Sequence, residues 1–456
     1  MLIDLYVMLT ATLLGFLSGF IPGIGMLMLL LLSYPFIAEM SILHLIMYYM
    51  CASAASQFSG SIVATVLGVP GESSSLPAVR EGNPLFHRGK GHFAISGAAL
   101  GSITGAFIVM LGVILVLPYA VDLIKQYYNN NVQLFILMFS AFSVIFLFGK
   151  ENILMNIFLF SFGVFLGSIG INTVPRTVLW VDYMPTSIFP QFYQGLPVFP
   201  VIIALYVLPI LFRSYSDQNQ VENQKQIKYV DMAKFSEHIK NYKDSFASVL
   251  RGSLVGSFTG LIPHIGLTLS SNLAYIWEKS IGLRKGTYHT KGDMKCLVSA
   301  ETANNGTAFM QLMPLILIGI PITASEALLL SIIERSSNSF NFSNTIESGL
   351  FEVLIFWFIL TNILAFLFSW PLIKYVNLLY KIDLKKIFVV TIVLLIFLIY
   401  YMGSRTMDEY YYAFVFCALA PIGYMLRGRD TLAVVVGFIL QQKIFESSIA
   451  FWQIYS

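Results

Sequence analysis

A carboxylate and two amides stand close together in an otherwise apolar part of the chain. Glu301, Asn304 and Asn305 lie between a basic segment that ends at Lys295 and an apolar run through Ile320. On a helix, the residues three and four positions after Glu301 share its face, so the three side chains would converge on one spot. Such an oxygen-rich cluster suits Na⁺, and a lone carboxylate suits a proton. The pattern predicts contact with a ligand or ion; a helix cap or a polar clamp between helices is the alternative.

A second polar constellation lies in the first half of the chain. Ser59-Gly60-Ser61 precedes Gly68-Val-Pro70-Gly71, which is followed by the hydroxyls of Ser73 to Ser75. A chain that breaks at Pro70-Gly71 and restarts would present free backbone N–H groups beside these hydroxyls, and such a place suits a carboxylate. An ordinary serine-rich turn leading to Arg80 is the alternative interpretation.

A third polar segment begins a new apolar run in the second half. Gly319-Ile-Pro321 is followed by Thr323 and Glu326, which have the spacing of a capping box. The box would satisfy backbone donors at a helix start, and the same N-terminus would attract an anion. The sequence leaves both interpretations open.

The elements that must position these groups contain a repeated motif. Gly15-Phe-Leu-Ser-Gly-Phe-Ile-Pro-Gly-Ile-Gly25 aligns without gaps on Gly256-Ser-Phe-Thr-Gly-Leu-Ile-Pro-His-Ile-Gly266, with six of eleven positions identical. Such a run removes side-chain bulk and a backbone donor, so a helix there should break or pack very closely on a neighbour. For one motif, tight packing without a ligand is the simpler interpretation. Its repetition in both halves favours broken helices at a transport site.

These motifs divide the candidate residues into two groups. The predicted substrate-binding residues are Ser59, Gly60, Ser61, Pro70, Gly71, Ser73, Ser74, Ser75, Gly319, Pro321 and Thr323. The predicted ion-coupling residues are Pro22, Gly23, Gly25, Pro263, Gly266, Glu301, Asn304, Asn305 and Thr307. A Na⁺ ion would bind at Glu301, Asn304 and Asn305.

The composition predicts an all-α polytopic membrane protein. Of 456 residues, 57% are hydrophobic and only 11% are charged, whereas a soluble domain carries roughly 25% charged residues. Apolar runs at 93–117, 132–148, 153–171, 351–370 and 387–401 approach or exceed the roughly 20 residues that span hydrocarbon. The first apolar run follows no basic leader segment, and we expect it to be retained.

Several function classes find no support in the sequence. The net charge is only +3 and the basic residues lie in short loops, so there is no footprint for nucleic-acid binding. Three cysteines without CxxC spacing indicate neither a zinc site nor a disulfide framework. No hydrolase, zinc-protease or P-loop motif is present. We therefore expect no enzyme and no cofactor.

One long polar stretch, 213–245, divides the chain. We predict a first transmembrane repeat at 1–212, a cytoplasmic linker at 213–246, and a second transmembrane repeat with C-terminal helices at 247–456. Within the linker, apolar residues near helical spacing predict either a surface helix on the lipid headgroups or a loose connection.

The distribution of basic residues orients the repeats. If the motifs around Pro22 and Pro263 form re-entrant hairpins, one side of the membrane carries 21 Lys and Arg residues and the other only four. The basic loops are 79–92, 149–151, 213–246, 278–296, 374–386 and 427–429. The positive-inside rule makes these loops cytoplasmic. The two hairpins then open to opposite sides, which is the inverted-topology arrangement of many secondary transporters.

In this order, the motifs resemble those of the large membrane subunit of the tripartite tricarboxylate transporters. That family carries the glycine-proline run, a Gly-Gly-Ser segment, a Pro-Gly turn, an Asp-Gly-Tyr-Pro loop, a second Pro-x-x-Gly run, Glu-Ala-Ala-Asn-Asn-Ala and Gly-Ile-Pro-Gly. The matching segments here are 15–25, 59–61, 70–71, 81–84, 263–266, 301–306 and 319–322. The resemblance spans nearly the whole chain. The chain departs from the pattern at Glu81, Asn83, His264 and Ile322.

The resemblance implies a multi-pass protein of the bacterial inner membrane with two inverted repeats. It would import a small di- or tricarboxylate-like anion by symport with Na⁺ or H⁺. Its partners would be a small four-helix membrane subunit and a periplasmic binding protein that delivers the substrate. Two rival functions remain: a channel would conduct without accumulating its solute, and a scaffold subunit would bind partners and move nothing.

Overall fold

The computed structural model describes most of the chain and confirms the all-α expectation. The described residues are 1–21, 25–68, 70, 73–127, 130–142, 145–146, 152–171, 178–212, 234–262, 266–288, 290–335, 350–379, 384–406, 408–429 and 431–455. Within them, one antiparallel pair, β1 (Gly170–Ile171) and β2 (Val178–Leu179), accompanies the helices. Four candidate site residues, Pro22, Gly23, Gly71 and Pro263, lie outside these ranges, as does His264.

The chain folds into two compact units, and each unit takes segments from both halves of the sequence. The first unit comprises Met1–Leu30, Ile37–Val121 and Gln220–Leu384, and the second comprises Leu31–Phe36, Asp122–Asn219 and Lys385–Ser456. The repeat boundaries expected from the sequence remain a prediction.

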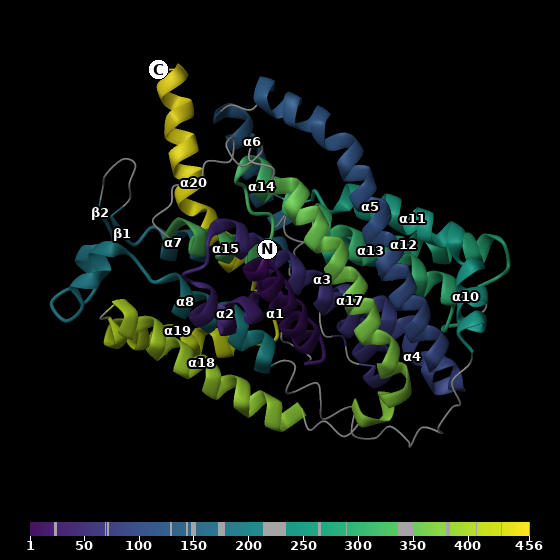
Figure 1. The fold of residues 1–456 in the computed structure, drawn as a ribbon. Helices are drawn as coiled ribbons and strands as arrows, with labels where there is room; N and C mark the ends of the chain where they lie inside the picture. Colours follow the sequence, from purple (N-terminus) through teal and green to yellow (C-terminus); the bar gives the residue numbers. More distant parts are fainter. Residues whose placement is uncertain are drawn as a thin grey trace. The chain divides into compact units, whose positions relative to one another are not determined.

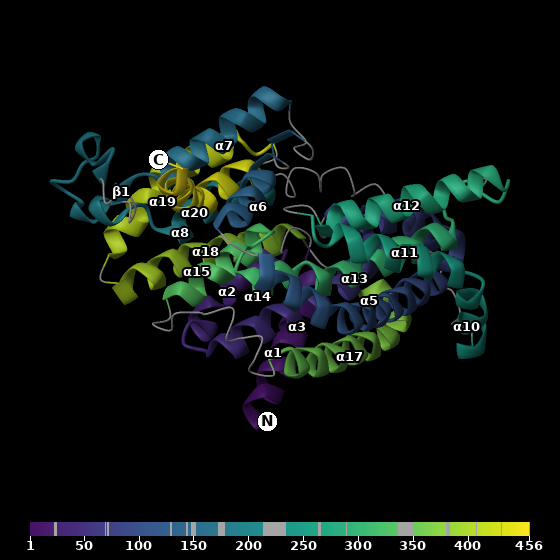
Figure 2. The same ribbon diagram turned by 90° about the horizontal axis from the view of Figure 1, so that it is seen from above.

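The first unit holds all of the candidate site residues that the structure describes. Its main helices are α1 (Leu2–Gly19), α3 (Ile42–Leu67), α5 (Gly91–Tyr127), α10 (Phe235–Lys243), α11 (Phe246–Thr259), α12 (Gly266–Arg284), α13 (Met294–Met310), α14 (Leu312–Ile318), α15 (Ala324–Arg335) and α17 (Leu350–Leu379), with α2 (Met26–Ile37) shared between the units. Short helical segments connect α3 to α5: η1 (Ser73–Ser75), η2 (Ala78–Gly82), α4 (Asn83–Leu85) and η3 (Phe86–Lys90). Helix α3 packs against α1 and α17 (Figure 1). Helix α13 packs against α11 and α12 (Figure 2).

The second unit is built around the C-terminal helix. Its helices are α6 (Asn130–Phe142), α7 (Ile153–Gly167), η5 (Val181–Tyr183), η6 (Pro190–Gln194), α8 (Val198–Ile202), η7 (Ile203–Val207), α18 (Leu384–Thr406), α19 (Glu409–Met425) and α20 (Leu432–Tyr455). Helix α20 packs on α6 and α7, and α19 packs on α8 and η7. Gly163 and Gly437 let α7 and α20 approach backbone to backbone, because a Cβ at either position would meet the other helix's carbonyl oxygen.

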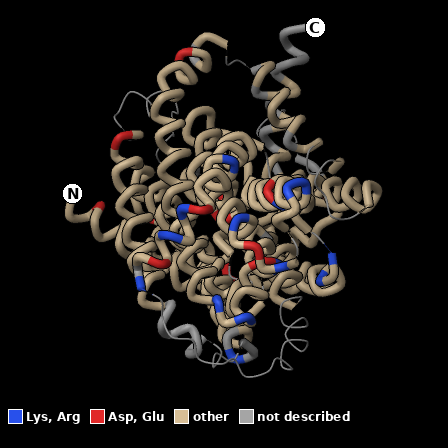
Figure 3. Tube along the Cα trace, turned by 90° about the vertical axis from the view of Figure 1, so that its right-hand side faces the viewer, with Lys and Arg blue, Asp and Glu red and all other residues tan. Residues whose placement is uncertain are grey.

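Within the part of the chain that the structure describes, four helices are long and apolar enough to cross a membrane. By length and composition, the spans are Leu2–Gly19, Ile42–Leu67, Ala78–Ile124 and Phe351–Leu372. Long stretches of the helices carry no charged residue (Figure 3). The structure thus agrees with the multi-pass membrane protein expected from the composition.

The repeated glycine motif acts through close helix packing in both halves. A Cβ at Gly15 would clash with the Ala52 carbonyl oxygen on α3, and one at Gly256 would lie 2.8 Å from the Ala303 carbonyl oxygen on α13. Each motif therefore brings its helix into backbone contact with the helix that carries a candidate site.

Each motif also contains a helix break at the same place. Helix α1 ends at Gly19 and α2 begins at Met26, while α11 ends at Thr259 and α12 begins at Gly266. Helices α11 and α12 pack against each other, as the arms of a hairpin do. The expected interruption of the helix is confirmed.

Both Gly-x-Pro segments end a helix in the same conformation. Gly68 after α3 and Gly319 after α14 have φ angles of 67° and 70°, the left-handed region that favours glycine. In the second segment, the backbone N–H groups of Ile322 and Thr323 donate to Glu326 Oε2, and the Glu326 N–H donates to Thr323 Oγ1. The capping box is confirmed.

Part of the polar linker is helical and packs on the protein. Helix α10 places His238 and Tyr242 against α5, where His238 Nδ1 lies 2.7 Å from Ser96 Oγ and the Tyr242 hydroxyl bonds to Thr104. This face of α10 is therefore covered by protein. Linker residues 213–233 lie outside the described residues.

A buried carboxylate holds the loop after α3 to the start of α13. Glu81 is fully buried and accepts hydrogen bonds from the Tyr288 hydroxyl at 2.9 Å, from the Asp293 N–H at 2.8 Å and from the Gly292 N–H. Burial, and then the bond to Glu81, raises the pKa of Tyr288 above its ordinary value. Asp293 itself caps α13 by accepting from the Cys296 N–H. The Glu81 carboxylate therefore fixes where α13 begins.

We expect Glu81→Gln to destabilise the protein by about 1–3 kcal/mol, because an amide cannot accept from all three donors and buried donors are left unpaired. The measurement is the thermal unfolding of the purified chain in detergent. Glu237→Gln, at an exposed position of α10, is the matched control and should unfold like the wild type. An unchanged midpoint for Glu81→Gln would contradict the assignment.

Candidate functional site

The acidic-amide segment of α13 meets α3 at two successive turns. The Ser61 hydroxyl donates to Glu301 Oε2, and Asn304 Nδ2 donates to Gln57 Oε1 at 2.8 Å. Gln57 and Ser61 are four residues apart and so share one face of α3. Glu301, Asn304 and Ser61 are at most 2% exposed, which places this polar contact in the interior of the first unit.

The serine turn after α3 reaches the same place. Ser74 Oγ donates to Gln57 Oε1 at 3.4 Å, and the Ser74 side chain is 1% exposed. Gln57 Oε1 therefore receives one donor from each predicted constellation. The structure brings the serine turn and the acidic-amide segment together through a residue that the sequence analysis did not select. The available signal was a lone amide one helical turn before Ser61.

Several amide atoms at this contact have no partner among the residues that the structure describes. Neither Oδ1 nor Nδ2 of Asn305 is hydrogen-bonded, and neither is Asn304 Oδ1, although both side chains are 1% exposed. Buried polar atoms are nearly always paired, so these atoms are available to a water molecule, a ligand or an ion. Two amide oxygens beside a carboxylate form the kind of oxygen set that hard cations prefer.

The carboxylate of Glu301 has no basic partner within the described part of the chain; its hydrogen bond is to Ser61. An isolated buried carboxylate is costly unless it is protonated or a cation lies beside it. The described residues contain no group of three His, Cys, Asp or Glu side chains that could hold a metal ion. The donor set fits Na⁺ or H⁺ better than a transition metal.

Other predicted ion-coupling residues serve helix packing. Thr307 Oγ1 donates to Ser270 Oγ at 2.6 Å and to the Gly256 carbonyl oxygen at 3.3 Å, so it ties α13 to both arms of the second hairpin. Gly266 is the first residue of α12, and Gly25 directly precedes α2. These residues position the elements around Glu301 and make no described contact with its carboxylate.

The remaining predicted substrate-binding residues lie away from this contact, some on α3 and others at the ends of neighbouring helices. Ser59 Oγ donates to the Ser56 carbonyl oxygen, beside Gly19 of α1. At the start of α15, Thr323 Oγ1 lies 3.2 Å from Ser325 Oγ, which is 3.0 Å from the Tyr49 hydroxyl of α3. Ser325 thus connects Thr323 to α3 about two turns before Gln57. Pro70, Gly319 and Pro321 mark the ends of helices.

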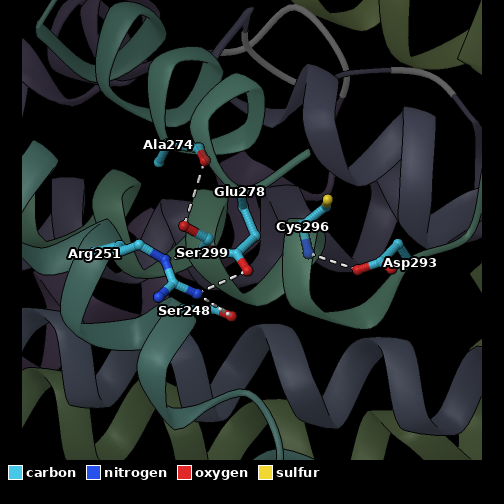
Figure 4. Close-up of polar contacts among 7 residues, drawn as sticks. All are labelled: Ser248, Arg251, Ala274, Glu278, Asp293, Cys296 and Ser299. Carbon is cyan, nitrogen blue, oxygen red and sulfur yellow. Dashed lines mark hydrogen bonds and ion pairs between the residues drawn. The ribbon is translucent and has the colours of Figure 1, made fainter. Parts of the chain in front are cut away.

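A buried ion pair holds the arms of the second hairpin together. Arg251 of α11 donates two hydrogen bonds of 2.8 Å to the Glu278 carboxylate of α12, and it lies 3.5 Å from Ser248 (Figure 4). Glu278 is 4% exposed and Arg251 side-chain exposure is 26%. Ser299 of α13 also donates to the α12 backbone, at Ala274 (Figure 4). The pair fixes the hairpin at the end opposite its loop, and no sequence motif pointed to it.

We predict that Arg251→Met destabilises the protein by about 3–5 kcal/mol, because Glu278 is left as an unpaired buried charge. Arg251→Met combined with Glu278→Met should recover part of that loss, since the double variant buries no charge. Denaturant unfolding of the purified variants measures both effects. If Arg251→Met and the wild type have the same free energy of unfolding, the ion pair does not stabilise the hairpin.

Comparison with known proteins gives two matches. Residues 5–435 match the model of the Tripartite tricarboxylate transporter TctA family. The chain is also similar to an uncharacterised 52.8 kDa protein in the TAR-I ttuC' 3' region of Agrobacterium vitis. The two are 23% identical over 436 residues, which cover 94% of this chain and 83% of the relative. No solved structure matches the chain.

Proposed function

The chain belongs to the tripartite tricarboxylate transporter TctA family, and from this premise we propose that it imports a small organic anion together with a coupling ion. As a family member, it is the multi-pass membrane component of a tricarboxylate transport system and is no enzyme. The substrate would be a di- or tricarboxylate, and the coupling ion Na⁺ or H⁺.

One observation supports this proposal above the others: Gln57 joins the two predicted sites. Its Oε1 accepts from Asn304 on the acidic-amide side and from Ser74 on the serine side. A change in the position of Asn304 on ion binding would therefore alter the bonds that Gln57 makes to the serine turn. A shared side chain of this kind provides a short route for coupling the two ligands.

The coupling ion would bind at Glu301, Asn304 and Asn305. Among the described residues, the amide oxygens of Asn304 and Asn305 have no hydrogen-bond partner and the Glu301 carboxylate has no basic partner, which supports a cation at this place. A proton on Glu301 would satisfy the carboxylate as well, so both ions are compatible with the residues present. The substrate carboxylate would bind on the side of the Ser74 turn.

Inverted repeats are supported by the matched local features of the two halves. The glycine motif packs α1 on α3 and α11 on α13, and Gly68 and Gly319 end the following helices in the same conformation. Each compact unit also contains segments from both halves. We propose alternating access by movement of these repeats around the site.

A tripartite system implies two partners. One is a small four-helix subunit in the bacterial inner membrane, and the other is a binding protein in the periplasm. The binding protein would deliver the anion to the outward side. A channel or a scaffold subunit is the rival function. Gradient-driven accumulation of the anion separates the three, because a channel only equilibrates its solute and a scaffold transports none.

Two substitutions should affect uptake differently. Asn305→Ala removes an oxygen from the ion site and should raise the ion concentration needed for half-maximal uptake, while Ser74→Ala should raise the half-saturating anion concentration. Each change should correspond to about 1–3 kcal/mol for a lost polar partner. Uptake at several ion concentrations in cells with the complete system measures both. Wild-type kinetics in both variants would show that these residues only pack helices.

The orientation can be tested by labelling single cysteines with an impermeant reagent. The background is Cys417→Ser, because Cys417 is exposed while Cys51 and Cys296 are buried. Since the predicted topology places 21 basic residues on one side and four on the other, a cysteine in 278–296 should be labelled only after the cells are opened. A cysteine in 173–195 should be labelled in intact cells. The reverse pattern would overturn the topology.

A further inference from the structure

Gly60 differs from the glycines that pack helices together. It lies inside α3 and is buried, yet a Cβ added there would meet no atom of the described residues within 4 Å, apart from its own helix backbone and chain neighbours. At Gly15, by contrast, an added Cβ would clash with the backbone of α3. Glycine is also the poorest helix former after proline. Packing therefore does not require a glycine at position 60, and the space beside it can hold at least a methyl group.

Further hydrogen-bonding groups of α3 lie on the same helix face as Gly60. Ser53 lies seven residues before Gly60, two helical turns away on the same face. Its hydroxyl is 1% exposed and has no hydrogen-bond partner in the described part of the chain. Gln57 lies between them, one turn from each, and both of its described hydrogen bonds use Oε1.

The chemistry of this face suits a carboxylate with a short hydrocarbon body. The Ser53 hydroxyl and the Gln57 amide nitrogen are donors, and Gln57 is held in place through its oxygen by Asn304. Farther along α3, Tyr49 shares a hydrogen bond with Ser325 at the start of α15. The face with Ser53 and Gly60 adjoins, and is distinct from, the face on which Ser61 meets Glu301.

We propose that the space beside Gly60 receives the hydrocarbon body of the transported anion, and that Gly60 thereby sets the largest anion that the protein carries. Ser53 and Gln57 donate to one of its carboxylates. This inference rests on the proposed function and adds to it the residue that limits substrate size.

The test compares Gly60→Ala and Gly60→Val with two glycine controls. Gly112 lies in α5, is exposed, and also has no atom within 4 Å of an added Cβ, so Gly112→Ala reports the effect of helix propensity alone. Gly15→Ala reports a true packing clash. The readouts are the thermal midpoint of each purified chain and the uptake of succinate and citrate by cells that carry the complete system with each variant.

We expect Gly60→Ala to keep or raise the thermal midpoint, as Gly112→Ala should, whereas Gly15→Ala lowers it. Filling the space with one methyl group should lower the uptake of citrate about 10-fold or more relative to that of succinate, and Val should lower it further. Since the binding protein is the same in all strains, a changed ratio of the two anions belongs to this chain. Gly112→Ala should leave the ratio unchanged.

Two results would overturn the inference while leaving the proposed function intact. One is a midpoint for Gly60→Ala that falls as far as that of Gly15→Ala, which would make Gly60 a packing residue. The other is wild-type uptake of both anions, or an equal loss of both, in a stable Gly60→Ala protein. If the wild type accumulates neither anion against a gradient, the proposed function fails and the inference fails with it.

Discussion

The placement of Glu301 within a bundle of apolar helices is the constraint on which the site depends. A carboxylate in such surroundings has no water to stabilise its charge. The protein supplies a hydroxyl from Ser61 on the neighbouring helix and no described basic partner. In the proposed function, a proton or a bound cation supplies the remaining compensation. Within the described residues, the unpaired amide oxygens of Asn304 and Asn305 are consistent with such an ion.

This arrangement requires helices that approach more closely than ordinary side chains allow. The side chains of Ser61 and Gln57 reach only a short distance from the α3 backbone. Helices α3 and α13 must therefore lie near each other for these hydrogen bonds to form. Glycines bring α1 onto α3 and α11 onto α13, and Gly101 and Gly105 bring α5 onto α13. In lipid, such close contact is itself a main source of helix association, because apolar side chains gain little by leaving the bilayer. The same glycines therefore stabilise the bundle and define the geometry of the site.

Charged groups near the ends of these helices fasten what the glycines bring together. Glu81 holds the loop after α3 to the start of α13, and the pair of Arg251 and Glu278 holds α11 to α12. Both carboxylates are buried and fully engaged with donors, in contrast to Glu301. Buried carboxylates in this protein thus serve two purposes, and the number of donors around each one distinguishes them. Glu81 accepts three hydrogen bonds and Glu278 accepts two from Arg251, and both hold helices together. Glu301 accepts one described bond, from the Ser61 hydroxyl, which leaves its carboxylate available for chemistry.

The sequence by itself determined the features that depend on neighbours in the chain. Low charge and long apolar runs predicted an all-α membrane protein, and the glycine-proline motifs predicted where helices break. The spacing of Thr323 and Glu326 predicted the capping box, and the ordered motifs identified the family. Each of these follows from local propensity or composition, which a linear pattern records directly.

Only the tertiary structure decided which of the polar groups meet. Gln57, on which the contacts of Asn304 and Ser74 converge, carries only a weak local signal, since a lone amide in a helix is equally compatible with a packing role. Nothing in the spacing distinguishes Thr307, which ties helices together, from Asn305, whose amide has no described partner. The same holds for Gly60 beside open space and Gly15 in a tight contact. Contacts between distant segments depend on how helices cross, and sequence distance does not encode that geometry.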